Sequence, residues 1–170
     1  MEDKSISCCF TGHRPMKLPW GMNEKDPRCV DLKLELAARL EGIYQMGYRR
    51  FICGMALGCD MYFAEAVLEL RQQHPDVTLE AAIPFGDQPG KWGVEQRQRY
   101  NRLIDSADQV TVLQYTYSRD CMMQRNRYMV DHASLLVACF DGRPGGTMNT
   151  ILYAQRSGVQ VIILDVEQTK

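Results

Sequence analysis

Apolar runs of strand length alternate with segments of helical periodicity along the chain. The run Leu135–Cys139 is continuously apolar, which indicates a strand buried on both faces. In contrast, Cys29–Met46 repeats its apolar positions at close to the helical period. The pattern predicts strands over Ser5–Phe10, Arg50–Cys53, Thr78–Ile83, Gln109–Leu113, Ser134–Phe140 and Gln160–Leu164. It predicts helices over Cys29–Met46, Met61–Leu70, Val94–Ile104, Arg125–His132 and Met148–Arg156.

This alternation predicts an α/β fold: a Rossmann-like, doubly wound and mainly parallel sheet with helices on both faces. In such sheets, ligands bind beyond the carboxyl ends of the strands, where the strand order reverses. Loops that follow predicted strands should therefore meet at one edge, which we call the carboxyl rim. We expect Thr11, Gly54, Pro84 and Gly145 on this rim.

Composition narrows the class of protein. With 170 residues, the chain is long enough for one core, and we expect a single domain over residues 1–170. The formal net charge of −1 disfavours a bulk electrostatic grip on nucleic acid or on an anionic membrane. The cysteines number 7 and most lie in apolar segments, so we expect reduced core thiols in a cytoplasmic protein. No apolar run suits a membrane span and no spacing suits a metal, so neither is expected.

The segment Phe140–Thr147 contains the most informative turn. It follows an apolar strand pattern and precedes a helical one, so its amides open onto a helix N-terminus. Gly145 and Gly146 allow close approach of the backbone to an anion, which the helix dipole also favours. A tight strand-to-helix turn without a ligand explains one such glycine pair equally well.

Two further loops have the same character. Thr11–Pro15 follows the first predicted strand and offers a hydroxyl, a free amide, an imidazole and a guanidinium suited to phosphate. Gly54–Asp60 follows the second, with a glycine spacing unlike the dinucleotide fingerprint. Asp60 is read first as a helix cap. The segment Met16–Pro27 is read as a lid or a functionless surface loop.

Weaker candidates lie at other strand and helix ends. Phe85, after Pro84, and Trp92 could stack on a base, although such aromatics more often pack against the sheet. The segment Arg125–Arg127 is predicted to open a helix and to bring Asn126 toward the carboxyl rim, while lone helical arginines are usually solvated. Helical geometry separates Asp60 from Glu65, so we do not read them as a paired acid and base.

Taken together, Phe10–Pro15, Gly54–Asp60 with Ala64-Glu65, Pro84-Phe85, Asn126 and Gly145–Thr147 resemble the YpsA-like branch of the SLOG superfamily. SLOG domains are Rossmannoid relatives of the LOG phosphoribohydrolases and of the DNA-processing protein DprA/Smf. The resemblance spans nearly the whole chain. It implies binding of a nucleotide or a nucleotide derivative, with ADP-ribose or NAD-like ligands suggested.

One departure from the LOG pattern bears on catalysis. LOG enzymes carry P-G-G-x-G-T-x-x-E, and their glutamate serves N-glycosidic cleavage. Here Pro144-Gly145-Gly146 leads directly into Thr147–Ile151, and the acidic residue is missing. Losing such a carboxylate typically forfeits a factor of ~10² to 10⁴ in rate. Asp60, Glu65 or Asp141 could substitute from another loop.

The sequence thus predicts a sensor or regulator that binds a nucleotide-derived small molecule, and it assigns no catalytic residue. The alternatives are a nucleotide N-glycoside hydrolase and a DprA-like nucleic-acid binder, which the charge disfavours. Any cofactor stays unassigned, and a homo-oligomer stays open. The predicted ligand-binding residues are Thr11, Gly12, His13, Arg14, Gly54, Gly58, Asp60, Pro84, Phe85, Asn126, Asp141, Gly145, Gly146 and Thr147.

Overall fold

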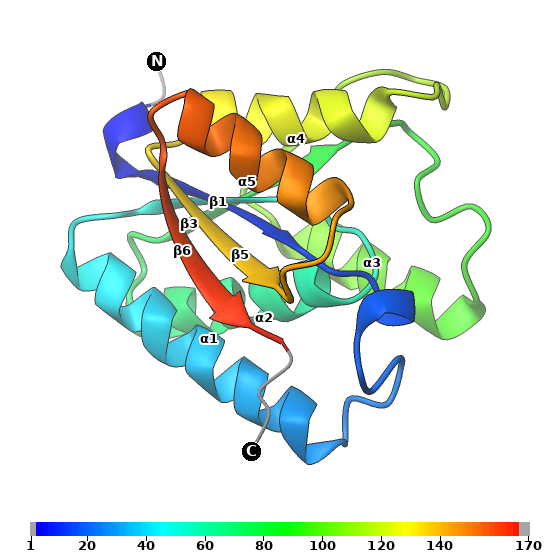
Figure 1. Cartoon of the computed structure of the whole chain (residues 1–170), viewed down its shortest axis with the longest axis horizontal. Helices are drawn as coiled ribbons and strands as arrows, with labels where there is room; N and C mark the ends of the chain where they lie inside the picture. Colours follow the sequence, from blue (N-terminus) through cyan, green and yellow to red (C-terminus); the bar gives the residue numbers. More distant parts are fainter. Residues whose placement is uncertain (1–2, 167–170) are drawn as a thin grey trace.

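The computed structural model describes residues 3–166, so the ends of the predicted domain, residues 1–2 and 167–170, lie outside the described residues. A six-stranded sheet with the order β4-β3-β2-β1-β5-β6 forms the centre of the molecule, and every neighbouring pair is parallel (Figure 1). The strands are β1 (Ser7–Gly12), β2 (Arg50–Cys53), β3 (Thr78–Ile83), β4 (Gln109–Val112), β5 (Leu135–Phe140) and β6 (Gln160–Asp165).

Helices cover both faces of the sheet, which confirms the predicted Rossmann-like α/β class (Figure 1). One core contains side chains of α1, α2 and α3, and the other contains side chains of α4 and α5. Alternate residues of β1 serve the two cores, with Phe10 stacked on Phe63 of α2 at 4.5 Å and Cys9 on the opposite face. The helices are α1 (Pro27–Gln45), α2 (Cys59–Gln73), α3 (Val94–Ser106), α4 (Cys121–Asp131) and α5 (Gly146–Arg156), with short 3₁₀ turns η1 (Lys4–Ile6) and η2 (Pro15–Lys17).

Several predicted boundaries differ from the structure by a few residues, and two of the differences have an identifiable cause. The first strand begins at Ser7 because Lys4–Ile6 forms a 3₁₀ turn capped by the Asp3 carboxylate. Helix α4 begins at Cys121, so Arg125 lies inside the helix and does not open it. Its buried face contains Cys121, Arg125 and Met129 at intervals of one turn, and the arginine interrupts the apolar periodicity on which the prediction depended.

The strand order reverses between β1 and β5. From β1 the chain adds β2, β3 and β4 on one side, then crosses to add β5 and β6 on the other. Gly12 at the end of β1 pairs in register with Cys139 near the end of β5. The loops after these two strands therefore diverge at the carboxyl rim and leave a crevice between them.

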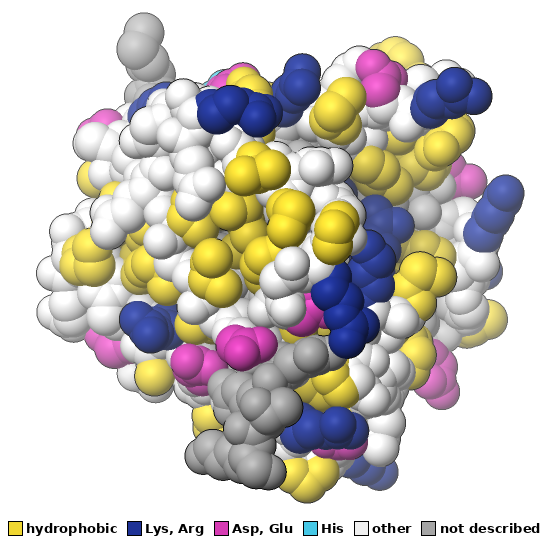
Figure 2. Space-filling view, viewed as in Figure 1, with side chains coloured by type: hydrophobic (Ala, Val, Ile, Leu, Met, Phe, Trp, Pro, Cys, Tyr) yellow, Lys and Arg dark blue, Asp and Glu magenta, His cyan; other side chains and the backbone are white. Residues whose placement is uncertain are grey.

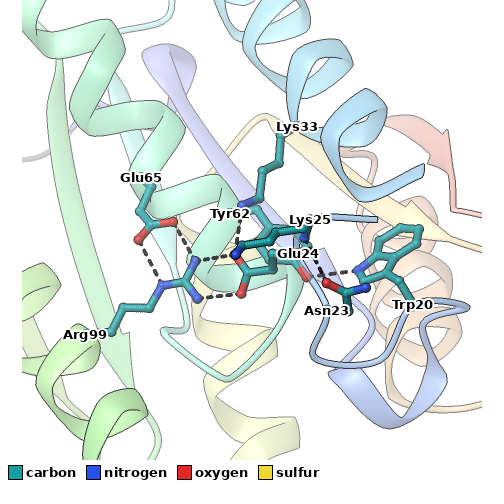
Figure 3. A network of polar contacts seen from close by, with 8 residues as sticks. All are labelled: Trp20, Asn23, Glu24, Lys25, Lys33, Tyr62, Glu65 and Arg99. Carbon is teal, nitrogen blue, oxygen red and sulfur yellow. Dashed lines mark hydrogen bonds and ion pairs between the residues drawn. The ribbon is translucent and has the colours of Figure 1, made fainter. Parts of the chain in front are cut away.

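The segment Met16–Pro27, predicted as a lid or a functionless surface loop, is anchored to the helices beneath it. Leu18 and Trp20 are buried, and the Trp20 indole donates to the Tyr62 hydroxyl at 3.1 Å. Glu24 accepts two hydrogen bonds from Arg99 of α3, at 2.6 and 2.9 Å, and Lys33 of α1 also donates to it (Figure 3). These contacts hold η2 beside the carboxyl rim.

Candidate functional site

A cavity of about 260 Å³ lies at the reversal point between β1 and β5. Its wall combines the loop after β1, the start of α2, one side of α4 and the first turn of α5. The predicted residues that line it are Thr11, Gly12, His13, Arg14, Asp60, Asn126, Gly146 and Thr147. The predicted residues outside its lining are Gly54, Gly58, Pro84, Phe85, Asp141 and Gly145.

The first turn of α5 presents free backbone amides to this cavity. Gly145 has φ 150° and ψ −164°, a conformation that is essentially restricted to glycine, and no side chain caps the helix. A Cβ on Gly146 would meet no atom within 4 Å, so open space lies in front of this residue. The Lys17 ammonium lies against Gly145. Amides and a cation thus surround an empty volume that suits an anion.

Other glycines of the predicted site serve packing. A Cβ on Gly12 would lie 2.6 Å from the Cys59 Cβ, so Gly12 permits close contact between β1 and α2. Gly58 has φ +91°, and a Cβ there would lie 2.8 Å from the His13 carbonyl oxygen. A Cβ on Gly54 would collide with the Arg125 guanidinium. These three glycines position the side chains of the site.

The buried side chain of Arg125 is the main feature that the sequence-based prediction missed, since it treated arginines of this helix as solvated. Its exposed fraction is 3%, and Nη1 donates to the Gly54 and Ala82 carbonyl oxygens at 2.6 and 3.3 Å. Nε donates to the Asn126 side chain at 2.9 Å. A cation on the apolar face of a helix, one turn from Cys121 and Met129, was the available signal.

Two guanidinium groups converge on one weak acceptor. Nη2 of Arg125 lies 3.8 Å from the Met122 sulfur, and Nη2 of Arg14 lies 3.6 Å from the same atom. A thioether accepts hydrogen bonds poorly. All three residues line the cavity. Among the contacts of residues 3–166, the Met122 sulfur is the one acceptor of these two Nη2 groups, whereas Nη1 and Nε of Arg125 have oxygen acceptors.

Asp60 is a buried carboxyl in the cavity wall and not the helix cap that the sequence suggested. Gly58 occupies the cap position of α2, and the Asp60 carboxylate accepts the amide of Ala56 at 3.0 Å. Burial raises the pKa of Asp60, and the nearby charges of Arg125 and Arg14 together with the Ala56 amide oppose that rise. Burial likewise lowers the pKa of Arg125, against the attraction of Asp60.

The loop that carries these groups is strained at one position. Met55 has φ +58° although it is not glycine, and its side chain is fully buried. Backbone strain of this kind is stable only where the surroundings enforce it. Here the enforced turn brings the Ala56 amide to Asp60 and the Gly54 carbonyl to Arg125.

His13 connects the cavity to Asp141. Its Nε2 lies 2.8 Å from the Asp141 carboxylate, and its Nδ1 lies 3.4 Å from the Thr147 hydroxyl. The side chains of His13 and Asp141 are 2% and 1% exposed. Asp141 also accepts the Arg143 amide at 2.9 Å, and burial, which raises the pKa of Asp141, is outweighed by this bond and by His13, so the pKa is lowered. Asp141 therefore orients His13 from behind.

The predicted aromatic and acidic candidates have other neighbours. Phe85 packs edge-on against Tyr117, with ring centroids 5.5 Å apart, and Trp92 packs in the same way against Tyr100. Glu65 binds Arg99, at 2.7 and 2.9 Å, which agrees with its separation from Asp60. The seven cysteines are free and buried, in agreement with core thiols.

A second hollow of about 360 Å³ continues from the cavity along the groove between α4 and α5. The two share Met122, Asn126 and Gly146. The groove also contains apolar Met123 and Leu152 and three arginines, Arg119, Arg127 and Arg156. Figure 2 shows Lys and Arg side chains gathered over η2 and the loop after β5, beside an apolar surface over α5 and β6.

A family model described as the YspA SLOG family, under the name YpsA, matches residues 8–162. The chain belongs to this SLOG family. The match includes every segment that lines the cavity, from the end of β1 to the first turn of α5.

Curated relatives agree with this assignment. An uncharacterised prophage-derived protein YoqJ of Bacillus subtilis is 32% identical over 146 residues, which are 78% of this chain and 85% of the relative. A UPF0398 protein of Bacillus pumilus is 29% identical over 140 residues, covering 81% and 74% of the two chains.

Solved structures share the fold. DNA processing protein A from Helicobacter pylori, described for its single-stranded DNA binding mode, superposes with a TM-score of 0.64 at 12% identity. The match covers 94% of this chain and 65% of that one. The X-ray structure of TM1055 superposes with a TM-score of 0.53 at 18% identity, over 95% and 72% of the two chains. At these identities the likeness concerns the fold.

The helices and the acidic, Cys and His side chains of residues 3–166 bear on membranes and metals. Within that range, no helix is both long enough and apolar enough to cross a bilayer. In the same range, no group of three or more His, Cys, Asp or Glu side chains has the arrangement of a metal site.

Proposed function

We propose that this SLOG protein binds a nucleotide or a nucleotide derivative, of the ADP-ribose or NAD type, in the cavity between β1 and β5. It acts as a single-domain sensor or regulator in the cytoplasm. The observation that carries the proposal is the convergence of Arg14 and Arg125 on the Met122 sulfur. A phosphate oxygen accepts far more strongly than a thioether, so an anion that displaces Met122 gains two charge-assisted hydrogen bonds.

The first turn of α5 supports a phosphate at the same place. Its uncapped amides and the open space at Gly146 allow an anion to approach the backbone closely. Lys17 and Arg14 add positive charge from the opposite wall. A single buried carboxyl, Asp60, offsets the cations, so the lining retains a net attraction for a negative group.

The groove between α4 and α5 supports a ligand larger than a phosphate. It adjoins the cavity at Gly146 and Asn126, and its apolar side chains suit the face of a nucleobase. The amides of Asn126 and Asn149 offer both donors and acceptors for a base edge. A nucleotide with its phosphate at α5 can thus extend into this groove.

The test combines discovery and confirmation of the ligand. Native mass spectrometry of the purified protein should reveal a copurified nucleotide-derived molecule. Thermal shifts with AMP, ADP-ribose and NAD should show stabilisation that grows as RT ln(1 + [L]/Kd) for at least one of them. Absence of both a copurified molecule and any shift would exclude the proposal for this ligand class.

Hydrolysis of an N-glycosidic bond is the second candidate, favoured by Asp60. This carboxyl lines the cavity and its pKa is raised by burial, as general acids often require. Glu65 and Asp141 are committed to Arg99 and His13. Release of free base over many turnovers, lost in Asp60→Asn with binding retained, would establish the enzyme. Binding without release supports the sensor.

Binding of single-stranded DNA is the third candidate function, because the structurally similar DNA processing protein A from Helicobacter pylori is described as binding single-stranded DNA. The arginines along the α4–α5 groove give that alternative a local basis, and the net charge of −1 argues against it. Fluorescence anisotropy with a labelled oligonucleotide at two salt concentrations distinguishes the two. An affinity for the oligonucleotide that exceeds the affinity for every mononucleotide would favour binding of single-stranded DNA as the function.

A further inference from the structure

Three buried polar side chains form a chain that ends at the cavity. They come from the loop after β1, the loop after β5 and the first turn of α5. Asp141 binds His13 Nε2 at 2.8 Å, and His13 Nδ1 faces the Thr147 hydroxyl at 3.4 Å. Counted as whole residues, His13 and Thr147 are 3% and 6% exposed. Of these three residues, Thr147 and His13 line the cavity and Asp141 does not, so Asp141 acts on the cavity through the imidazole.

Hydrogen-bond donors and acceptors fix where the protons of this chain lie. The Asp141 carboxylate can only accept, so Nε2 of His13 carries a proton and donates it. In the neutral imidazole the other nitrogen, Nδ1, is then an acceptor. The Thr147 hydroxyl oxygen lies 3.4 Å from Nδ1. With Nδ1 as an acceptor in the neutral imidazole, this hydroxyl is the donor of the pair. In this arrangement the hydroxyl proton is directed at Nδ1 and is not available to an anion.

An anion at the first turn of α5 competes for the same proton. Phosphate oxygens only accept, so Thr147 can help to bind them only by turning its hydroxyl proton toward the cavity. His13 Nδ1 would then be a buried acceptor without a donor, which costs about 1–3 kcal/mol. A doubly protonated imidazole removes this cost, because Nδ1–H then donates to the Thr147 oxygen.

We propose that His13 takes up one proton from solvent when an anion binds at the first turn of α5, and that the Thr147 hydroxyl then turns to donate its proton to the anion. The inference rests on the proposed function above. The proton moves from buffer to Nδ1, the Thr147 hydroxyl rotates, and no bond of the ligand breaks. The site thereby gains a positive charge only when an anion is present. His13 is a positioning residue, and the preferred ligand group is one with full negative charge.

Other titratable groups near His13 have to be separated from it. Asp60 is the main rival, because it lines the same cavity and burial raises its pKa. The hydrogen bond with Cys139 and burial raise the pKa of Cys59, so this thiol stays neutral. The remaining charged groups are basic side chains: Arg14, Lys17, Arg125 and Arg143.

Sulfate is the probe, since it keeps its double charge across the range in which histidine titrates. NMR spectra of ¹⁵N-labelled protein at about pH 7 should show a single proton on the His13 ring, at Nε2, and protons on both nitrogens when sulfate is bound. His74 and His132 serve as internal references. Sulfate affinity, followed at the Gly146 amide at constant ionic strength, should fall by up to about tenfold per pH unit between about pH 6 and 8.

Variants assign the effect. Thr147→Val should weaken sulfate binding and abolish its pH dependence, and Thr147→Ser should restore both. Asp60→Asn should leave the pH dependence in place. A dependence lost in Asp60→Asn and retained in Thr147→Val would overturn the proposal in favour of Asp60.

Two further outcomes separate this inference from the proposed function. Sulfate binding with equal affinity at about pH 6 and about pH 8, without a second proton on the His13 ring, overturns the proton uptake and leaves the anion site intact. No saturable response of the Gly146 amide at either pH overturns the anion site itself, and with it the inference.

Discussion

Arg99 of α3 and Arg125 of α4 are both largely buried, but their hydrogen-bond partners differ. Arg99 lies between Glu24 and Glu65 and donates four hydrogen bonds to their carboxylates, at 2.6 to 2.9 Å (Figure 3). Arg125 is more deeply buried, yet it binds two carbonyl oxygens, one amide and a methionine sulfur. The first cation is satisfied by the protein, and the second is satisfied only in part.

The difference separates a structural cluster from the proposed binding site. A buried charge is costly unless opposite charges and hydrogen bonds compensate it. The Arg99 cluster meets this condition and fastens the segment after η2 onto α2 and α3. The Arg125 environment meets it incompletely, because Asp60 is near but forms its hydrogen bond with Ala56. This incomplete compensation is what we expect of the proposed anion site.

The largest expected effect comes from exchanging the two arginines for an apolar side chain of similar length. Arg125→Met should reduce affinity for the nucleotide ligand by about 100-fold, because a charged hydrogen bond contributes about 1.5–3 kcal/mol. Arg99→Met should lower the free energy of unfolding by about 2 kcal/mol and leave affinity nearly unchanged. Calorimetric titration and chemical unfolding of both variants make the comparison. Equal losses of affinity would erase the distinction drawn above.

The two arginines also show what the sequence could and could not predict. The order of strands and helices followed from apolar runs and helical periods, because burial on both faces of a parallel sheet leaves a strong local signal. The three glycine-containing loops directly follow predicted strands, and this position alone predicts that they lie at the carboxyl rim. The local sequence predicts a solvated Arg125, because its partners at Gly54 and Ala82 lie far away in the sequence and only the folded sheet brings them together.

Asp60 and Phe85 show the same limit. A carboxylate in the first turn of a helix is most often a cap, but the strained turn at Met55 directs the Ala56 amide to Asp60. Phe85 follows a strand and was a candidate for base stacking, whereas Tyr117, from a later loop, packs against its ring. Contacts between loops decided both outcomes, and no local pattern encodes them.

Two glycines at helix N-termini, Gly146 and Gly93, extend the comparison to the backbone. Gly146 opens α5 at the cavity, Gly93 caps α3 elsewhere, and a Cβ on either would meet no atom within 4 Å. Gly146→Val should lower ligand affinity by about 30-fold, because its side chain enters the space of the anion. Gly93→Val should have little effect on affinity, and it should change the melting temperature of the ligand-free protein about as much as Gly146→Val does. Thermal shift with and without ligand measures both quantities, and matched losses of affinity would make Gly146 purely structural.

A smaller effect should follow from changing only the shape of a cation. Arg14→Lys keeps the charge but loses the planar fork that allows two parallel hydrogen bonds to one phosphate. We expect affinity to fall about fivefold, or about 1 kcal/mol. Arg39→Lys on the exposed side of α1 is the control and should leave affinity unchanged. Unaltered binding by Arg14→Lys would place Arg14 outside the contact.

The smallest effect concerns the satisfied cluster and depends on pH. Burial raises the pKa of Glu24, but hydrogen bonds from Arg99 and Lys33 outweigh it, so the pKa lies below its ordinary value of 4.5. A carboxyl with a lowered pKa in the folded state stabilises the protein above the ordinary value, and the benefit is lost as pH falls through the folded value. Glu24→Gln should therefore unfold about 1 kcal/mol more easily than the wild type at about pH 7.

The difference between Glu24→Gln and the wild type should shrink progressively below about pH 4.5, where protonation neutralises Glu24 in the unfolded and then in the folded chain. Urea unfolding of both proteins at several pH values gives the curve. Ligand affinity at about pH 7 should stay within a factor of about two, since Glu24 lies outside the cavity lining. If affinity falls as far as in Arg14→Lys, then the cluster around Arg99 sets the geometry of the anion site through η2, and the two regions are coupled.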